Sequence, residues 1–592
     1  MFQTFDTTTT PDQGPPRIAA LRDLMAREGW DAVLVPRADA HQGEYVAPCD
    51  ARLEWLTGFT GSAGFAVITP NEAALFVDGR YTVQGRAQTA PEVSIVPWPK
   101  TKLHEWLADH LSGSVLAFDP WLHTVREIEG LRKALETRNI EVRAVANPVD
   151  LFWTDRPAPP NAKAVPYPAD LAGKTSSEKR EEVAVALRKA GHHAAVITQP
   201  DSIAWLLNIR GADIPRVPIM QAFAIVHEDA RVDLFCVPAK VGALGPDPAI
   251  TVHEWDALAS ALTYLSGPVR LDPATCPWQV KELLAEGEVE IAEGTDPCAL
   301  PKARRTQAEL DGTRAAHRRD AAAMCRFLAW LDRQEPGTFT EISVVTALEG
   351  FRRETNVLRD ISFDTIAGAG PNGAIVHYRV NRETDRTVAP GLLLVDSGGQ
   401  YEDGTTDITR TVLIGDPPLG DERSLFTAVL RGMIAVSRAR FPKGTAGRDI
   451  DPLARQFLWA EGRDYDHGTG HGVGHYLSVH EGPQRISRIS EVPLEPGMIL
   501  SNEPGYYREG AFGIRIENLI AVTTADAEEG RDFLGFETLT LVPIDRRLID
   551  AQALSQAERT WIDAYHARVA DEIGPLLAGR DRDWLMDAAR PL

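Results

Sequence analysis

The stretch LLLVDSGGQYEDGTTDITRTVLIG, residues 392–415, contains two expected strands, and each of them carries an aspartate. The first is the apolar run 392–395, which ends in Asp396. The second spans 405–413, is rich in β-branched side chains and contains Asp407. An apolar strand that ends in aspartate is unremarkable alone, so a metal-binding role depends on what the rest of the chain supplies.

The turn between these strands decides whether the two aspartates lie together. The pair Asp403-Gly404 is typical of a hairpin turn. A strict two-residue turn there would place Asp407 opposite Gln400, four residues and roughly 13 Å along the strand from Asp396. For the carboxylates to share a metal, we expect a wider turn or a bulge, which Gly398-Gly399 would permit.

Histidines are concentrated in the glycine-rich segment HGTGHGVGHYLSVHEGP, residues 467–483. Four of the 15 histidines of the chain lie there, at positions 467, 471, 475 and 480. The intervening glycines allow tight turns and a close approach to a ligand. The cluster therefore predicts a functional site, in which His475 is expected only to hydrogen-bond the local loop.

Two glutamates follow the histidine segment, Glu503 in SNEPGYY and Glu517 in GIRIENLI. A carboxylate in a strand between Ile516 and Leu519 is costly to bury unless it is paired or bound to a metal. Arg515 is a possible partner, but we expect strand alternation to point its side chain to the other face. A metal ion accounts for Glu517 better.

These residues together form a candidate metal-binding set: Asp396, Asp407, His471, Glu503 and Glu517. Four carboxylates and one imidazole suit Mn²⁺, Co²⁺ or Zn²⁺. The set exceeds what one catalytic ion needs, whereas two ions about 3.5–4 Å apart and bridged by carboxylates fit it. We therefore expect a hydrolase with two divalent ions, Mn²⁺ first among them, and a bridging hydroxide as the nucleophile.

Two N-terminal stretches look like copies of one unit: residues 21–40 with 52–69, and residues 181–213. Each contains an amphipathic helix, a glycine where the helix should stop, an apolar strand and then a Trp-Leu pair. These positions are Gly29 and Gly191, Trp55-Leu56 and Trp205-Leu206. Chance similarity is the alternative, but the shared Trp-Leu pair favours two related α/β domains.

Domain boundaries are indicated by a linker and a helix start. The proline-rich segment 154–179 predicts a stiff, extended linker. A second boundary is expected near Cys298 to Lys302, because Thr306 and Glu309 then form a capping box. We therefore expect α/β domains at 1–160 and 175–300 and an α+β domain at 301–592.

Further helix starts are expected in the C-terminal part. They are Thr338 with Glu341, Asp451 followed by Pro452 in a helix that ends at Gly462, and Ser555 with Glu558.

Composition excludes several other classes of protein. The net charge of −22 argues against sequence-independent binding to nucleic acid. The five cysteines, at 49, 236, 276, 298 and 325, show no metal-binding spacing and are expected to be reduced. No signal peptide is visible, and no apolar run approaches the ~18 residues that cross a bilayer. We expect a cytoplasmic protein without a nucleic-acid or membrane partner.

The motifs resemble those of the pita-bread metallopeptidases, a family that includes methionine aminopeptidase, prolidase, aminopeptidase P and creatinase. The order Asp, ten residues, Asp, then His, Glu and Glu matches the ligands of that family. Within it, HGTGHGVG, VHEGP, EPGYY and GIRIEN are most similar to the long, three-domain aminopeptidase P branch. The resemblance also covers EYVAPCDARLEWLTGFTGSAG, DGRY and LTLVPID, and so extends over nearly the whole chain.

The resemblance implies two creatinase-like domains followed by a pita-bread catalytic domain. It also implies a homodimeric metallo-aminopeptidase that hydrolyses the N-terminal Xaa-Pro bond of peptides with proline at the second position. The implied roles are Asp396 on one ion, His471 and Glu503 on the other, Asp407 and Glu517 as bridges, His377, His467, His480 and Glu503 in catalysis, and Arg80, Tyr506 and Arg515 in substrate binding.

Three alternatives compete with this interpretation. A prolidase acts on the Xaa-Pro dipeptide and needs a group that binds the free carboxylate, which the sequence does not exclude. A binding protein on an inactive pita-bread fold would have lost ligands, whereas all five are present. Residues 368–373 match GxGxxG, but no clear helix follows them, so a dinucleotide site is disfavoured.

Overall fold

The computed structural model describes residues 1–111 and 115–592. The chain forms two compact units. One comprises Thr8–Lys302, and the other comprises Met1–Thr7 together with Ala303–Leu592. Among the described residues, no helix has both the length and the apolar character needed to cross a membrane.

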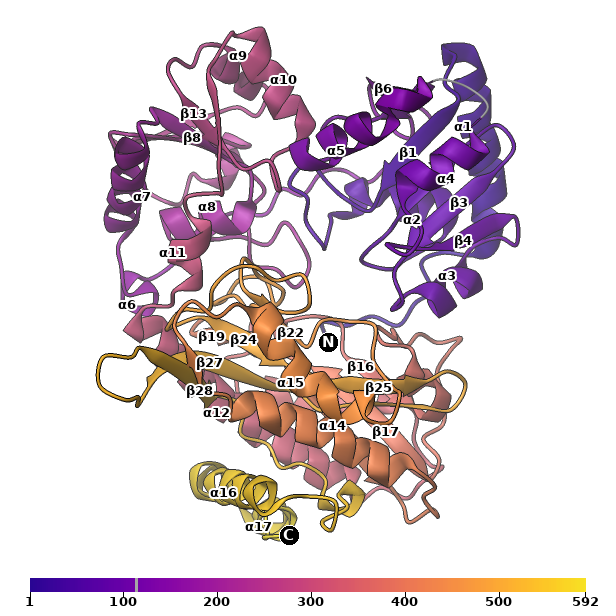
Figure 1. Ribbon diagram of the computed structural model, residues 1–592, viewed down its shortest axis with the longest axis vertical. Helices are drawn as coiled ribbons and strands as arrows, with labels where there is room; N and C mark the ends of the chain where they lie inside the picture. The colour runs from indigo at the N-terminus through magenta and orange to yellow at the C-terminus, as the bar shows by residue number, and fades with distance from the viewer. Residues whose placement is uncertain (112–114) are drawn as a thin grey trace. The chain divides into compact units, whose positions relative to one another are not determined.

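The N-terminal unit contains two six-stranded sheets (Figure 1). The first, in the order β4-β3-β2-β1-β5-β6, is built from β1 (Ala32–Pro36), β2 (Phe65–Ile68), β3 (Ala73–Val77), β4 (Val93–Pro97), β5 (Val115–Phe118) and β6 (Glu141–Ala144). The second, in the order β12-β11-β10-β8-β13-β14, is built from β8 (Ala194–Ile197), β10 (Phe223–His227), β11 (Val232–Phe235), β12 (Ile250–His253), β13 (Val269–Leu271) and β14 (Ile291–Glu293).

The two sheets have the same topology. The central strand β1 is antiparallel to β2 and parallel to β5, and β8 is likewise antiparallel to β10 and parallel to β13. The helices at the copied positions are α1 (Gly14–Glu28), α2 (Arg52–Thr57), α7 (Ser176–Ala190) and α8 (Pro200–Leu207). Gly29 and Gly191 end α1 and α7 in the left-handed conformation, and the Trp-Leu pairs lie in α2 and α8. The expectation of two related α/β domains is confirmed.

Reciprocal backbone hydrogen bonds join the two domains at the starts of α5 (Val125–Leu135) and α10 (Trp278–Glu286). They are Val125 N to Cys276 O at 3.0 Å, Trp278 N to His123 O at 2.8 Å, Arg126 N to Pro273 O at 2.8 Å and Gln279 N to Pro120 O at 2.9 Å. Each bond donated by the first domain has a counterpart donated by the second domain from the equivalent position: Val125 corresponds to Trp278, and Arg126 to Gln279. The contact therefore has the pattern of a local two-fold axis.

The C-terminal unit combines small antiparallel sheets with long helices. The site strands are β16 (Ile366–Ala369), β17 (Gly391–Ser397), β18 (Gly399–Tyr401), β19 (Gly404–Thr405), β20 (Ile408–Ile414), β22 (Gly470–His471), β23 (Arg485–Ile486), β24 (Ile499–Asn502), β25 (Gly505–Arg508), β26 (Phe512–Arg515), β27 (Asn518–Ala525) and β28 (Phe533–Thr538). Strands β16, β17 and β20 form one sheet, and β24, β27 and β28 lie in another.

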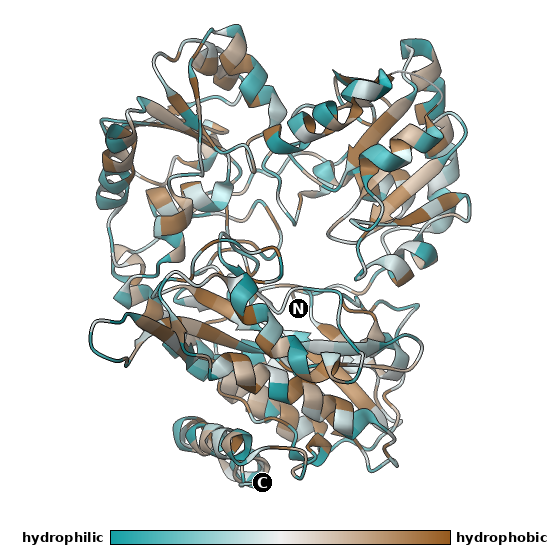
Figure 2. Ribbon diagram, viewed as in Figure 1, coloured by the Kyte–Doolittle hydropathy of each residue, from teal (hydrophilic) through white to brown (hydrophobic). Residues whose placement is uncertain are grey.

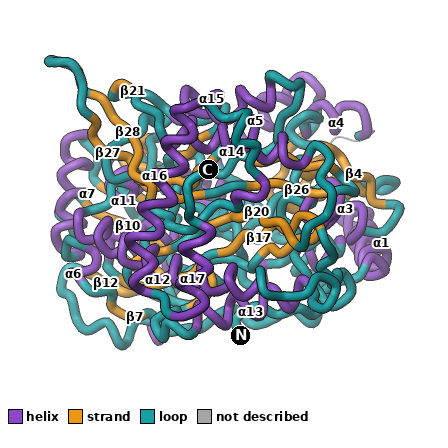
Figure 3. Tube along the Cα trace, turned by 90° about the horizontal axis from the view of Figure 1, so that it is seen from below, coloured by secondary structure: helices purple, strands orange, loops and turns teal. Residues whose placement is uncertain are grey.

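Helices pack against these sheets and share a hydrophobic core with them. They are α12 (Gln307–Leu331), α13 (Glu341–Arg353), α14 (Glu422–Ser437), α15 (Gly447–Trp459), α16 (Gln556–Ile573) and α17 (Gly579–Ala588). Helix α14 packs on α15, and both C-terminal helices pack on α12 (Figure 3). The strands are largely apolar, whereas the helices alternate apolar and polar faces (Figure 2).

Two of the four expected helix starts are confirmed. Thr306 caps α12 with Glu309, and Ser555 caps α16 with Glu558. The other two are wrong. Helix α13 is capped two residues later than expected, by Thr340, and α15 begins one turn before Asp451, which lies buried inside the helix.

The hairpin turn is one residue earlier than expected. Tyr401 pairs with Gly404 and Ser397 with Ile408, so the turn residues are 402–403 and Asp407 stands opposite Gly398. Asp396 and Asp407 are thus offset by two residues, about 7 Å along the strands, and lie on the same face. The predicted bulge is unnecessary. A Cβ at Gly398 would lie 2.0 Å from Thr406 O, so glycine permits the close strand approach there.

Candidate metal centre

Five acidic and imidazole side chains reach one place from different strands of the C-terminal unit. Asp396 lies in β17, Asp407 directly before β20, His471 in β22, Glu503 directly after β24, and Glu517 between β26 and β27. The β17–β20 pairing and the β24–β27 pairing therefore supply four of them.

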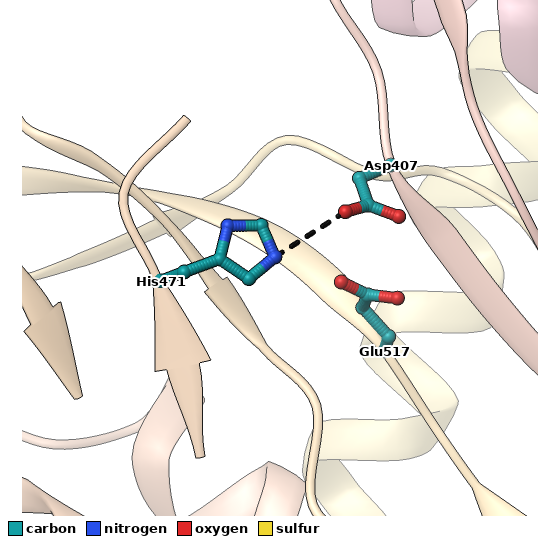
Figure 4. Close-up of side chains that lie close together, drawn as sticks. All are labelled: Asp407, His471 and Glu517. Atoms are coloured by element: carbon teal, nitrogen blue, oxygen red, sulfur yellow. Dashed lines mark ion pairs between the residues drawn. The ribbon is translucent and has the colours of Figure 1, made fainter. Parts of the chain in front are cut away.

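The side chains converge within metal-binding distance. One ligand atom from each of Asp407, His471 and Glu517 lies within 4.8 Å of the other two (Figure 4). His471 Nε2 is 3.4 Å from Asp407 Oδ2 and 3.4 Å from Glu503 Oε1. These separations leave room for a cation between the donors.

Hydrogen bonds outside the cluster orient its ligands. His471 Nδ1 donates to Gly472 O at 2.9 Å, which directs the lone pair of Nε2 toward the carboxylates. Ser501 Oγ accepts from the backbone N–H of His471 at 2.9 Å and donates to Glu503 Oε1 at 3.1 Å. Imidazole and carboxylate are thus held in the arrangement that a metal ligand needs.

The buried carboxylates repel one another. Burial raises the pKa of Asp407 to about 6. The hydrogen bond from His471 lowers this pKa, whereas the negative charge of Asp396 raises it further. Burial, together with the charges of Asp407 and Glu503, also raises the pKa of Glu517 well above its usual value. Burial alone would lower the pKa of His471, but Asp407 and Glu503 raise it to about 9. The cluster has an excess of negative charge that a cation would relieve.

Two oxygens in the cluster lack any hydrogen-bond partner within the described parts of the chain. They are Oδ1 of Asp396 and Oδ1 of Asp407, and both are buried. A buried carboxylate oxygen without a donor is costly and uncommon in native proteins. The residues therefore fit divalent metal ions.

Arg515 lies beside the cluster and pairs with Asp396. Its Nη2 donates to Asp396 Oδ2 at 2.7 Å and its Nη1 to Tyr507 OH at 2.7 Å. The expectation that alternation would turn Arg515 away from Glu517 is wrong, because residues two apart in an extended chain share a face. Arg515 nevertheless neutralises Asp396 rather than Glu517.

The tyrosine pair of β25 splits between the two faces of the strand. Tyr507 OH lies 2.9 Å from His467 Nε2, whereas the Tyr506 ring packs beside Phe512 and under the guanidinium of Arg463. Tyr507, which was not among the predicted site residues, is therefore the one that faces the cluster. Alternation puts the two rings on opposite faces, but the sequence alone does not say which ring points inward.

The remaining histidines lie at different distances from the centre. The His480 ring centroid is 4.2 Å from that of His471. His377 follows Val376, whose carbonyl accepts from Arg515 Nη2 at 3.3 Å, so its backbone borders the cluster.

His467 and His475 have partners within the protein. His467 Nδ1 donates to Gly468 O at 2.8 Å, so Nε2 accepts from Tyr507. His475 lies 3.2 Å from the Thr313 hydroxyl of α12, a contact outside the local loop where it was expected.

Arg80 belongs to the N-terminal unit. Its Nε and Nη2 donate to Asp78 at 3.0 and 2.7 Å, and its guanidinium lies near the Tyr81 ring. Its role in substrate binding stays a prediction.

Family models match almost the whole chain. Residues 311–524 match metallopeptidase family M24, and 532–592 match the C-terminal region of that peptidase. Residues 17–151 and 155–309 each match the creatinase/prolidase N-terminal domain.

Curated relatives match over most of their length. The probable Xaa-Pro aminopeptidase P of Paracoccidioides brasiliensis (strain Pb03) is 40% identical, over 97% of this chain and 99% of its own. The chain belongs to metallopeptidase family M24. Aminopeptidase P2 of Arabidopsis thaliana is a further M24 relative, 39% identical over 97% of this chain and 88% of its own.

Solved M24 structures share the fold. The X-prolyl aminopeptidase of Caenorhabditis elegans, described as a cytosolic enzyme with a di-nuclear active site, superposes with a TM-score of 0.92. It is 33% identical and covers 98% of this chain and 99% of its own. The prolidase of Pyrococcus horikoshii, 23% identical with a TM-score of 0.50, shares the fold over only 62% of this chain. The predicted fold, two creatinase N-terminal domains before an M24 pita-bread domain, is confirmed.

Proposed function

We propose that this M24 chain is an Xaa-Pro aminopeptidase, which hydrolyses the bond between the first residue of a peptide and a proline at the second position. The observation that carries the proposal is the buried cluster in which His471 Nε2 meets Asp407 and Glu503 at 3.4 Å, with Glu517 beside them. Relatives at about 40% identity over nearly the whole chain carry that name.

The proposed cofactor is a pair of divalent ions, Mn²⁺ before Co²⁺ or Zn²⁺. Asp396 would hold one ion and His471 with Glu503 the other, and Asp407 and Glu517 would serve both. Such a pair supplies Lewis acidity and an activated water near neutral pH. The buried oxygens of Asp396 and Asp407 support two ions rather than one, since they come from different chain segments and neither has a donor among the described residues.

Glu503 is the proposed proton carrier. The leaving proline nitrogen is tertiary in the substrate amide, so a proton must reach it before it can depart as an amine. Glu503 is more exposed than Asp407 or Glu517 and is held by Ser501 at 3.1 Å, which keeps its carboxylate at the open side of the cluster.

His377, His467 and His480 are the proposed substrate-side imidazoles. His480, stacked edge-on to His471, is placed to donate to a carbonyl oxygen that develops negative charge. His467 accepts from Tyr507, so we propose that this tyrosine and His467 act as a unit. For substrate binding we retain Arg80 and Arg515, and the orientation of β25 favours Tyr507 over Tyr506.

Proline selectivity rests on the chemistry of the substrate. Proline has a fixed φ and no backbone N–H, so a selective site offers an apolar wall and no acceptor. When metal ions occupy the cluster, a free N-terminal amine bound there would place the first carbonyl at the nucleophile and would limit cleavage to one residue.

A peptide panel tests the proposal. The panel contains Ala-Pro-Ala, Ala-Ala-Ala, N-acetyl-Ala-Pro-Ala and the dipeptide Ala-Pro, and cleavage is measured as release of free alanine. We expect rapid cleavage of Ala-Pro-Ala, little of Ala-Ala-Ala, and none of N-acetyl-Ala-Pro-Ala. Equal rates on the first two would contradict proline selection and leave a general M24 aminopeptidase. Activity confined to Ala-Pro would instead identify a prolidase.

We further propose the boundaries 1–160, 175–300 and 301–592, a homodimer, and a cytoplasmic location. Separate family matches to residues 17–151, 155–309 and 311–524 support a division into three domains, and the location is supported by the C. elegans relative, which is described as cytosolic.

A further inference from the structure

Arg410 is a buried cation whose hydrogen-bond partners, among residues 1–111 and 115–592, include no carboxylate. Its side chain is 1% exposed. Its donors reach Thr409 O at 2.9 Å, Glu517 O at 2.6 Å, Asn518 Oδ1 at 2.8 Å, Val542 O at 2.7 Å, Pro543 O at 3.1 Å and Tyr565 OH at 3.0 Å. Because a buried charge needs a full set of partners, this many converging oxygens fix the positions of the segments that supply them.

Arg410 and its neighbour Thr409 bond both the carboxylate and the backbone of Glu517. Thr409 Oγ1 donates to Glu517 Oε2 at 2.7 Å, and the backbone N–H of Glu517 donates to Thr409 O at 3.1 Å. Arg410 Nη1 bonds the carbonyls of both residues. The carboxylate and the backbone of Glu517 are thus positioned by two consecutive residues of β20.

Tyr565 connects this arrangement to the C-terminal helix α16. Its hydroxyl accepts from Arg410 Nη2 at 3.0 Å and from Val542 N at 3.2 Å, and it lies 2.8 Å from Val542 O and 3.0 Å from Thr540 O. The next residue, His566, accepts from Ile544 N at 3.1 Å. One turn of α16 therefore holds the segment 540–544, which in turn supplies oxygens to Arg410.

We propose that Tyr565 is a positioning residue of the metal centre, acting through Arg410 on Glu517, so that the C-terminal helix sets the affinity for metal. The inference rests on the proposed function only in taking Glu517 as a ligand. Removing a hydrogen-bond partner that orients a metal ligand commonly weakens metal affinity 10–100-fold.

The test compares Tyr565→Phe with Val569→Ala. The first removes one hydroxyl and keeps the ring. The second removes two methyl groups from a fully buried residue of the same helix, which has no hydrogen bond to Arg410. Apoprotein of each variant and of the wild type is titrated with Co²⁺, read by its visible absorption, and unfolded thermally in parallel.

We expect Tyr565→Phe to weaken Co²⁺ binding about tenfold and to alter the Co²⁺ spectrum. Val569→Ala should lower Tm at least as much and leave Co²⁺ affinity unchanged. Unchanged affinity in Tyr565→Phe, or equal weakening in Val569→Ala, would overturn the inference while the metal centre stood. Wild-type protein that bound no Co²⁺ would overturn both.

Discussion

Two buried acidic sites in the C-terminal unit differ in how their oxygens are satisfied. Glu341 is fully buried and accepts from Ala369 N at 2.7 Å, Tyr378 OH at 2.8 Å, Arg386 N at 3.1 Å and Asn372 Nδ2 at 3.0 Å. In the metal cluster, by contrast, Asp396 and Asp407 each keep a buried oxygen that accepts from no donor in the described part of the chain.

The contrast separates a structural carboxylate from a ligand. Both sites incur the desolvation cost of a buried charge. At Glu341 protein donors offset that cost, and the segment they tie down runs directly before and after His377. At the cluster the donors are too few, so a cation from solution has to complete the site.

Removal of the metal ions should have the largest effect of the changes considered, because it acts only on the site where carboxylate oxygens lack donors among the described residues. We expect exhaustive chelation to abolish peptidase activity, and Mn²⁺ or Co²⁺ to restore it, because the proposed ions would supply the activated water. Elemental analysis of active protein should approach two ions per chain. Full activity without detectable metal would end the metal hypothesis.

Asp407→Asn should come next, with a loss of at least ~10³-fold in kcat/KM, since a bridging carboxylate serves both ions. The apoprotein should keep or gain thermal stability, because the substitution removes one charge from a set whose burial raises the pKa of Asp407 to about 6. Wild-type turnover at low metal concentration would show that Asp407 is no bridge.

His480→Ala should lower kcat on Ala-Pro-Ala by about 10²–10³-fold, the usual loss for a donor to a developing oxyanion. Metal content should stay at the wild-type value, because His480 lies outside the proposed ligand set and meets the His471 ring edge-on, with the ring centroids 4.2 Å apart. Loss of metal in this variant would mean that His480 is part of the ligand set.

Glu341→Gln should have the smallest effect on chemistry and a clear one on folding. We expect the free energy of unfolding to fall by about 1–3 kcal/mol, since the amide must face donors such as Ala369 N and Arg386 N with only one acceptor oxygen. Metal content, measured after purification, should be unchanged. A variant that lost metal but kept its stability would reverse the assignment of the two sites.

How far the sequence predicts this molecule depends on whether a signal is local. The capping boxes at Thr306 and Ser555 were predicted because side chain and backbone lie three residues apart. The start of α15 was not, since Asp451 resembles a cap locally but is buried in contact with Arg455 and Thr469. Asp-Pro alone does not reveal those tertiary partners.

The site shows the same division. The residue types of the cluster were predictable from apolar strands that end in carboxylates and from the histidine segment. The one-residue shift of the hairpin, which brings Asp407 within two positions of Asp396, depends on which of two adjacent turns packs better. The inward choice of Tyr507 likewise depends on Arg515, which arrives from the neighbouring strand.

The reciprocal contact between the two N-terminal domains should not depend on the concentration of the protein. Two separate chains that met through such a self-complementary contact would dissociate as their concentration fell. Here both partners are carried on one polypeptide, so the linker holds each at a high effective concentration for the other, on the order of millimolar. The two sides of the contact also need not have the same sequence. His123 stands on one side at the position that Cys276 occupies on the other, and each residue can be substituted without changing its counterpart.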